Sequence, residues 1–351
     1  MVALPMRDSK MADKTTVRKR RGSGAVTLND VAKIAGVAPI TASRALNKPD
    51  QVSPDVLQRV KEAVDRTGYV PNRMAGGLAS AKSKMIAAIV PSAVSSVFMD
   101  TIEALNNTLF DSGYQLMLGQ SGYSADRQEM LIESFIGRRP DGIFLTGVLN
   151  AGKGRTKLLA SGIPIIETWD LTSTPMDMLI GFSHSEVGRS VAQFLLKKKR
   201  TKFAVITGND ERAARRYGAF CEELKKAGIK KVPVEVVGSK STMHLGRVAL
   251  GNILDTQPGT QAVFCSSDVS ALGVLAEAQA RGIKVPEQLA VVGFGDGPYA
   301  ADTVPGLTSV RVNGSEIGAL AARYLIQRAE GEEVDSRIVD IGFSIIERGT
   351  T

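Results

Sequence analysis

Short apolar runs alternate with amphipathic stretches along most of the chain from residue 84 onward. Nine runs are apolar without alternation, which is typical of parallel strands buried on both faces: 85–91, 114–120, 141–147, 163–169, 178–182, 202–208, 232–238, 262–267 and 289–295. Between them, apolar residues follow helical spacing at 100–112, 126–138, 152–161, 184–198, 213–227, 243–256 and 268–281. The pattern predicts an α/β body of two doubly wound parallel-sheet subdomains, with a ligand cleft at the carboxyl ends of the strands.

Residues 27–68 show a second pattern, that of three short helices. Thr27 is a candidate N-cap, Gly36 a left-handed C-cap, Pro39 a first helical residue, Ser53 a second N-cap and Gly68 a final stop. Two short helices joined by a glycine-containing turn, with a third as support, predict a helix-turn-helix head. Three-helix bundles without a DNA function share this pattern.

The distribution of charge favours nucleic acid over that alternative. Of the 44 Lys and Arg, 14 lie in residues 1–80 against 7 Asp and Glu, whereas 30 face 29 in residues 81–351. A basic head on a neutral body is typical of a DNA-binding protein. A solvated basic tail would explain the basic residues at 18–21 but not the pattern of a folded domain that follows them. Residues 1–25, polar and ending in Gly-Ser-Gly, are expected to be a disordered basic arm.

Other classes find little support in the sequence. No run of eighteen apolar residues predicts a membrane span, and the N-terminus lacks the apolar stretch of a secretory signal, so a cytoplasmic protein is expected. The cysteines Cys221 and Cys265 and the histidines His184 and His244 show no metal-ligand spacing. No nucleophile–base pair or phosphate loop occurs, so we expect neither an enzyme nor a cofactor.

The motifs together resemble the lactose repressor family of bacterial transcription regulators. The stretch VTLNDVAKIAGVAPITASRALNKPDQVSPDVLQRVKEAVDRTGYVPNRMAGGLAS resembles its DNA-binding head and hinge, and DGIFLTG, VPEQLAVVGFGD and PGLTSVRV resemble its body. The resemblance covers about residues 26–345. It implies a head at 26–70, a hinge helix or linker at 71–83, and an effector-binding and dimerisation domain at 84–345. That domain would comprise subdomains at 84–183 and 184–310 and a C-terminal crossover. VPSAVSSVFMDTIEAL and VFCSSD resemble the gluconate-utilisation branch.

The resemblance also implies which residues bind DNA. The operator would be pseudo-palindromic and bound by a homodimer; family tetramers exist, but the C-terminus lacks the leucine heptads that tether them. Pro39 and Ile40 occupy base-reading positions, Ile40 suiting a thymine methyl, and Leu78 would wedge into the minor groove. The implied DNA-binding residues are Thr27, Leu28, Pro39, Ile40, Thr41, Ser43, Arg44, Asn47, Asn72, Arg73, Ala75 and Leu78. Ala38 replaces a usual serine, which removes one capping or phosphate contact.

Residues at strand tips are the candidates for effector binding. Trp169 beside Asp170 suits a platform for a sugar face with a hydroxyl acceptor, and Arg215 stands where the family binds ligand. Arg212 and Arg216 are expected to be a solvated basic turn. The candidate effector-binding residues are Phe98, Thr146, Trp169, Asp170, Arg215, Ser267, Asp268 and Asp296. An arginine suits neutral sugars and sugar acids alike; Gly295, standing where many sugar-binding relatives carry an acid, favours an acidic effector.

The expected function is that of a repressor controlled by a sugar acid such as gluconate. Effector binding would close the cleft, shift the first subdomains across the dimer interface and melt the paired hinges, which Gly76-Gly77 weaken. Three alternatives remain at this level: a neutral-sugar effector, a corepressor that strengthens operator binding, and a sugar receptor without DNA function.

Overall fold

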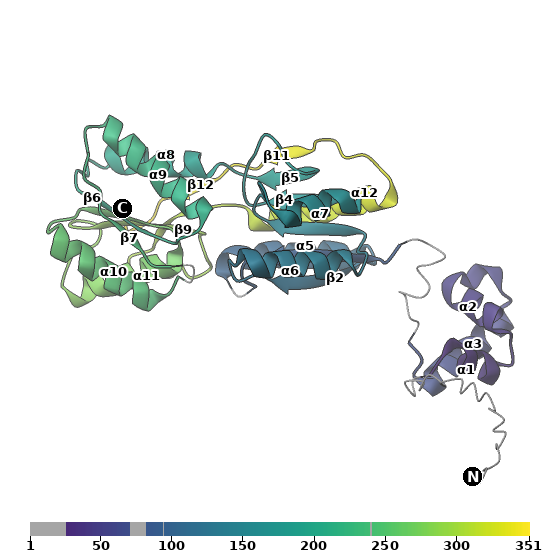
Figure 1. The fold of residues 1–351 in the computed structure, drawn as a ribbon. Coiled ribbons are helices and arrows are strands. Elements are labelled where there is room, and N and C mark those ends of the chain that lie inside the picture. The colour runs from purple at the N-terminus through teal and green to yellow at the C-terminus, as the bar shows by residue number, and fades with distance from the viewer. Residues whose placement is uncertain (1–25, 71–81, 94, 239–240) are drawn as a thin grey trace, which may run out of the picture. The chain divides into compact units, whose positions relative to one another are not determined.

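The computed structural model describes residues 26–70, 82–93, 95–238 and 241–351. The chain divides into two compact units, Met1–Ala81 and Lys82–Thr351 (Figure 1). The expected basic arm at 1–25 and the hinge residues Asn72, Arg73, Ala75 and Leu78 lie outside the described residues.

The first unit contains the predicted helices α1 (Leu28–Ala35), α2 (Pro39–Asn47) and α3 (Pro54–Thr67), with a short 3₁₀ turn, η1 (Pro49–Gln51), before α3. Thr27 and Asp30 form a capping box at the start of α1, and Gly36 ends it at φ 65°. Ala38 makes no side-chain cap on α2, as its substitution for serine predicted. The helices bury a small apolar core: Val31, Ala32, Ala35, Ala42, Ala45, Val60 and Ala63.

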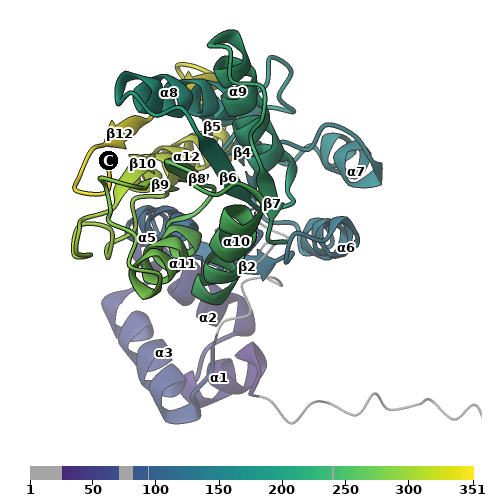
Figure 2. The same cartoon turned by 90° about the vertical axis from the view of Figure 1, so that its left-hand side faces the viewer.

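The second unit begins with a parallel sheet in the order β11-β5-β4-β3-β1-β2. Its strands are β1 (Met85–Val90), β2 (Gln115–Gln120), β3 (Gly142–Thr146), β4 (Ile165–Thr168), β5 (Met178–Gly181) and β11 (Ile338–Asp340). Helices α5 (Ser96–Asp111) and α12 (Gly314–Glu330) cover one face, and α6 (Ala125–Ile136) and α7 (Lys153–Ser161) the other (Figure 2). Ile86 and Ala88 point to the first face and Ala87 and Ile89 to the second, so both faces are buried.

The other sheet has the order β12-β10-β9-β8-β6-β7 and is parallel except for β12. Its strands are β6 (Phe203–Thr207), β7 (Val234–Val236), β8 (Ala262–Cys265), β9 (Ala290–Phe294), β10 (Thr308–Arg311) and β12 (Ser344–Ile346). Helices α8 (His184–Lys197) and α9 (Glu211–Lys226) cover one face, and α10 (Met243–Thr256) and α11 (Asp268–Ala280) the other (Figure 2).

The chain passes between the two sheets three times, at 182–183, 312–313 and 341–343. The predicted strands β1 to β9 and helices α5 to α11 are confirmed, but β10, β11, β12 and α12 were not predicted. The three strands have only three or four residues each, and β11 and β12 are half-buried or exposed, so they lack the apolar runs of the central strands. For function, the important feature of this arrangement is that both sheets present the carboxyl ends of their parallel strands to the same cleft.

Within the described part of the chain, no helix is long and apolar enough to cross a membrane.

Candidate DNA-reading face and effector cleft

Helix α2 has one face in the core of the head and one open to solvent. Ala42 and Ala45 are buried, while Pro39, Ile40 and Arg44 are exposed. Ile40 is 69% exposed, which places a large apolar side chain at the start of the helix with nothing of the head covering it. An exposed apolar group followed by a cation is the combination that contacts a thymine methyl and a phosphate or guanine edge.

The other predicted DNA-binding residues of the head lie around this face, and they differ in how far hydrogen bonds or burial hold their side chains. The Asn47 amide donates to the Ser43 carbonyl at 2.9 Å, and Thr41 and Ser43 are half-buried. The Thr27 hydroxyl donates to Asp30 at 2.7 Å. Leu28 is half-buried and packs against the core of the head.

The carboxyl ends of the two sheets enclose a cavity of about 400 Å³. Of the predicted residues that line the cavity, Phe98 and Trp169 come from the side of the first sheet and Ser267 comes from the side of the second. The lining also contains residues that were not predicted, among them His184, Asp210, Arg212 and Arg216, together with hydroxyls of Ser96, Ser266 and Thr242. A cavity of this size, lined by aromatic rings, charged groups and hydroxyls, suits a small metabolite.

Trp169 forms the aromatic floor of the cavity. It is buried at φ 62°, and its indole N–H donates to the Thr101 hydroxyl at 3.2 Å. Its ring meets Phe98 edge-on, with centroids 5.1 Å apart, and Phe182 at 5.9 Å. A non-glycine residue in the left-handed region persists where its surroundings fix it, so the indole is held in one orientation.

Arg216 is the most distinctive group in the cavity. It is only 6% exposed, and no carboxylate lies within 4 Å of it among the described residues. Its guanidinium lies over the Phe294 ring, 4.1 Å from the centroid, and donates to His184 Nδ1 at 2.9 Å. Burial lowers the pKa of Arg216 to about 10, so the group is still charged at neutral pH.

His184 connects Arg216 to the aromatic floor. Because Nδ1 accepts from Arg216, Nε2 carries the proton and donates to the Trp169 carbonyl at 2.9 Å. Burial and the neighbouring Arg216 charge lower the pKa of His184 well below its ordinary value. A neutral imidazole therefore fixes the arginine without neutralising it, which leaves a buried positive charge facing the cavity.

Three predicted residues lie instead in an adjoining cleft of about 580 Å³: Thr146, Asp170 and Arg215. Arg215 is 40% exposed and pairs with the Asp170 carboxylate. Arg212 lines both clefts, with its guanidinium over Phe98 and its Nε 3.7 Å from the Asp210 carboxylate. Six of the eight predicted residues are thus divided between two neighbouring spaces.

Asp268 and Asp296 line neither cleft. The Asp268 carboxylate accepts from the Ser309 hydroxyl at 2.6 Å and the Gly297 amide at 2.7 Å. The Asp296 carboxylate, 3% exposed, accepts from Arg311 and Arg348 at 2.6 Å each. Both carboxylates therefore hold the 295–307 loop and β10 in place, and neither lines the cavity.

The expectation of a solvated basic turn at Arg212 and Arg216 is wrong. Helix α9 begins at Glu211, so residues 212, 216 and 220 fall on one face, and Phe220 is in the core. The register turns Arg216 inward and Arg215 toward the adjoining cleft. The spacing of Arg212, Arg216 and Phe220 was the available signal. His184 gave no such signal, because its role depends on contacts with residues distant in sequence.

Among the described residues, no cluster of three or more His, Cys, Asp or Glu side chains could hold a metal ion. The chemistry of the cleft is that of a binding site built from the buried Arg216 cation, the Arg212–Asp210 pair, aromatic rings and hydroxyls.

Comparisons with known proteins agree with this division into a DNA-reading head and a binding body. The profile of the bacterial regulatory proteins of the lacI family matches residues 27–72, and that of the periplasmic binding protein-like domain matches residues 192–351. The transcriptional regulator GntR of Pseudomonas aeruginosa is 38% identical over 341 residues, 97% of this chain and 98% of the relative.

Solved structures give the same result. A LacI-family regulator from Silicibacter pomeroyi is 30% identical with a TM-score of 0.87, over 93% of this chain and 99% of that one. The lac repressor dimer bound to operator, 21% identical, has a TM-score of 0.80 over 93% and 99% of the two chains and shows the likeness in fold.

The head and the cleft are those of a DNA-binding transcription regulator, and its relatives are regulators rather than enzymes. The chain belongs to the LacI family, and its likeness to GntR supports the gluconate-repressor branch that the body motifs predicted.

Proposed function

We propose that this regulator is a repressor whose operator affinity is controlled by a sugar acid such as gluconate. The observation that carries the proposal is the buried charge of Arg216, which faces the cavity and has no carboxylate partner among the described residues. A buried cation without a counter-ion is costly, and an anionic ligand removes that cost. A carboxylate also matches the planar guanidinium in a bidentate geometry.

The rest of the cavity suits the polyol part of such a ligand. Hydroxyls of Ser96, Ser266 and Ser267 line it together with Phe98. Ring faces and edges cover the C–H surfaces of a sugar chain, while hydroxyls exchange hydrogen bonds with its O–H groups. A neutral sugar would satisfy these groups equally well but would leave Arg216 without a carboxylate in direct contact, which favours the acid.

The test begins with a duplex that the unmodified chain selects from a random-sequence pool. Operator affinity is then measured with increasing gluconate and, in parallel, with sorbitol, which has the same chain length and no charge. We expect gluconate to lower the affinity at least tenfold and sorbitol to leave it within twofold. Equal responses to both compounds, or none to gluconate and related sugar acids, would contradict the proposal. A gluconate-induced strengthening would instead indicate a corepressor.

We propose further that the chain works in the cytoplasm as a homodimer on a pseudo-palindromic operator. The solved lac repressor with this fold is described as a dimer bound to operator. Large apolar side chains are exposed on α5, β2 and α6 of the first sheet: Met99, Phe110, Leu118 and Met130. Cleft closure would shift these elements between the subunits and, through the 71–81 segment, release the head. An effector can drive this change only if it binds the two states with different affinities.

The exposed side chain of Ile40 gives a prediction for base reading. Replacing it with Ala is expected to weaken binding to the selected duplex several-fold, because a methyl contact in the major groove is lost. Affinity for random-sequence DNA is expected to stay within twofold, since no charge changes. Repeating the selection with the variant should relax the preference for thymine at one position of each half-site. An unchanged selected sequence would show that Ile40 does not read bases.

A further inference from the structure

The body begins with three residues, of which the third has an unusual backbone conformation. Lys82, Ser83 and Lys84 directly follow the 71–81 segment and precede β1. Lys84 has φ 53°, in the left-handed region that L-residues other than glycine, asparagine and aspartate rarely adopt. Such a conformation persists where surrounding contacts fix it.

Asp141, at the turn before β3, provides the first set of contacts. Its carboxylate accepts from the backbone amides of Ser83 at 2.8 Å and Lys84 at 2.7 Å, and from the Ser83 hydroxyl at 3.0 Å. Its own amide donates to the Met85 carbonyl at 2.8 Å. One carboxylate thus binds two consecutive amides at the left-handed turn, which fixes the backbone direction at this point.

Glu330, the last residue of α12, provides the second set. Its carboxylate accepts from the buried Tyr114 hydroxyl at 2.7 Å and from Lys84 Nζ at 2.7 Å, and it pairs with Lys82. Lys84 Nζ also lies 4.3 Å from the centroid of the Tyr114 ring. The two lysines lower the pKa of Glu330 to about 2, so it is ionised at any physiological pH. We call Asp141, Tyr114 and Glu330, with the residues 82–84 that they hold, the 82–84 clamp.

Helix α12 connects this clamp to the effector cavity. At its other end, a Cβ on Gly314 would lie 3.5 Å from the Trp169 ring and 2.9 Å from the Thr101 hydroxyl. One turn further, a Cβ on Gly318 would lie 2.2 Å from the Thr101 carbonyl, so α12 contacts α5 backbone to backbone. The helix that touches the aromatic floor of the cavity therefore ends on the first residues of the body.

We propose that Asp141 and Glu330 are positioning residues for DNA binding: they fix the direction in which the chain leaves the body toward the head. The proposal uses the DNA-binding activity of the family and is independent of which effector the cavity takes. Isolated exposed ion pairs contribute little, but here two carboxylates and a buried tyrosine act on three consecutive residues. Specific binding requires the head to have a defined orientation on the DNA, whereas binding to random DNA depends mainly on the positive charge of the head.

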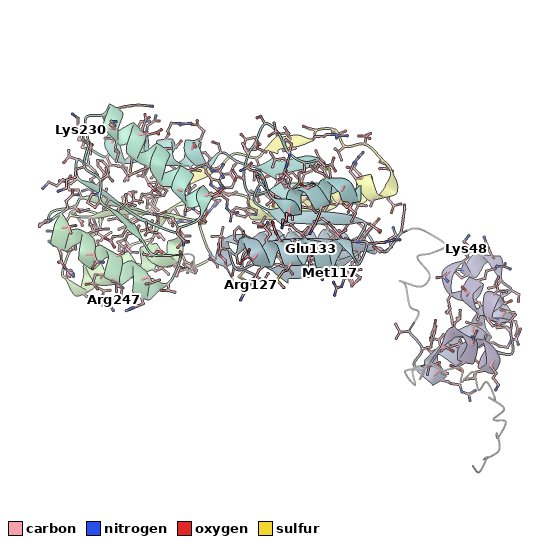
Figure 3. All side chains as sticks on the ribbon, viewed as in Figure 1. Lys48, Met117, Arg127, Glu133, Lys230 and Arg247 are labelled. Atoms are coloured by element: carbon pink, nitrogen blue, oxygen red, sulfur yellow. The ribbon has the colours of Figure 1, made fainter. Side chains whose placement is uncertain are left out.

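The test is the double variant Asp141→Asn with Glu330→Gln in the full chain. Its control is Glu133→Gln with Glu186→Gln, which removes two carboxylates from surface pairs with Lys157 and Arg189; Glu133 is labelled on α6 in Figure 3. Affinities are measured for the selected duplex and for a random duplex of equal length. We expect the clamp variant to lose at least tenfold in affinity for the selected duplex and the control to lose none.

The direction of the change in DNA affinity distinguishes an effect of positioning from an effect of charge. Removing two negative charges strengthens DNA binding through electrostatics alone, and the control measures that gain. A loss restricted to the selected duplex, with random-duplex binding equal to the control, supports the proposal. Affinity for the selected duplex within twofold of the control, or an equal loss on both duplexes, would overturn it. Glu330→Gln alone, at the half-exposed end of α12, provides the same comparison if the double variant melts early.

Discussion

Arg216→Gln is expected to abolish the response of the operator complex to gluconate, with a loss of gluconate affinity of about 100-fold. Truncating one partner of a buried, hydrogen-bonded charge pair costs about 2–5 kcal/mol, and each 1.4 kcal/mol is tenfold in affinity. Glutamine can still donate a hydrogen bond but carries no charge to balance a carboxylate. Isothermal titration with gluconate measures the loss directly, and operator affinity without gluconate should stay within threefold.

The neighbouring arginine is the matched control. Arg215 differs from Arg216 by one position, is 40% exposed and already pairs with Asp170 in the adjoining cleft. Arg215→Gln removes the same charge and is expected to change gluconate affinity by no more than about threefold, because Arg215 lines the adjoining cleft and not the cavity. If Arg215→Gln abolished the response and Arg216→Gln preserved it, the anion would be held in the adjoining cleft.

The sequence was most informative where structure follows from local chemistry. The ends of the head helices depend on Thr27, Gly36, Pro39 and Gly68, whose capping and backbone preferences act within a few residues. The central strands were found because burial on both faces leaves an uninterrupted apolar run. The C-terminal strand β12 has no such run, because it pairs at a sheet edge and is half-exposed.

The candidate site was predicted only in part, because its chemistry depends on helix register and on long-range contacts. Trp169 and Phe98, chosen because each follows a strand, line the cavity, whereas Arg215 lines the adjoining cleft and its neighbour Arg216 lines the cavity. On a helix, one position rotates a side chain by about 100°, enough to move it from one cleft to the next. Asp296 looked available from sequence, since nothing local shows that Arg311 and Arg348 bind it.

The same helix α9 that presents Arg216 is held against α8 by a glycine, and this contact gives the second large expected effect. A Cβ on Gly188 would lie 2.0 Å from the Arg216 carbonyl and 2.9 Å from the Phe220 amide, both backbone atoms. Gly188→Ala is expected to force the helices apart, costing about 1–3 kcal/mol or more. It should lower the melting temperature of the body by about 5 °C.

Gly218→Ala, on α9 itself, is the control for Gly188→Ala. A Cβ there meets no heavy atom within 4 Å, and the residue is helical, so alanine should stabilise by up to about 1 kcal/mol. The two substitutions add the same methyl to packed helices and are expected to act with opposite signs. Because the Gly188 contact is made to Arg216 itself, Gly188→Ala should also weaken gluconate binding, whereas Gly218→Ala should not. A melting temperature that rises in both variants would show that α8 and α9 have room to separate, and that Arg216 is not fixed by this packing.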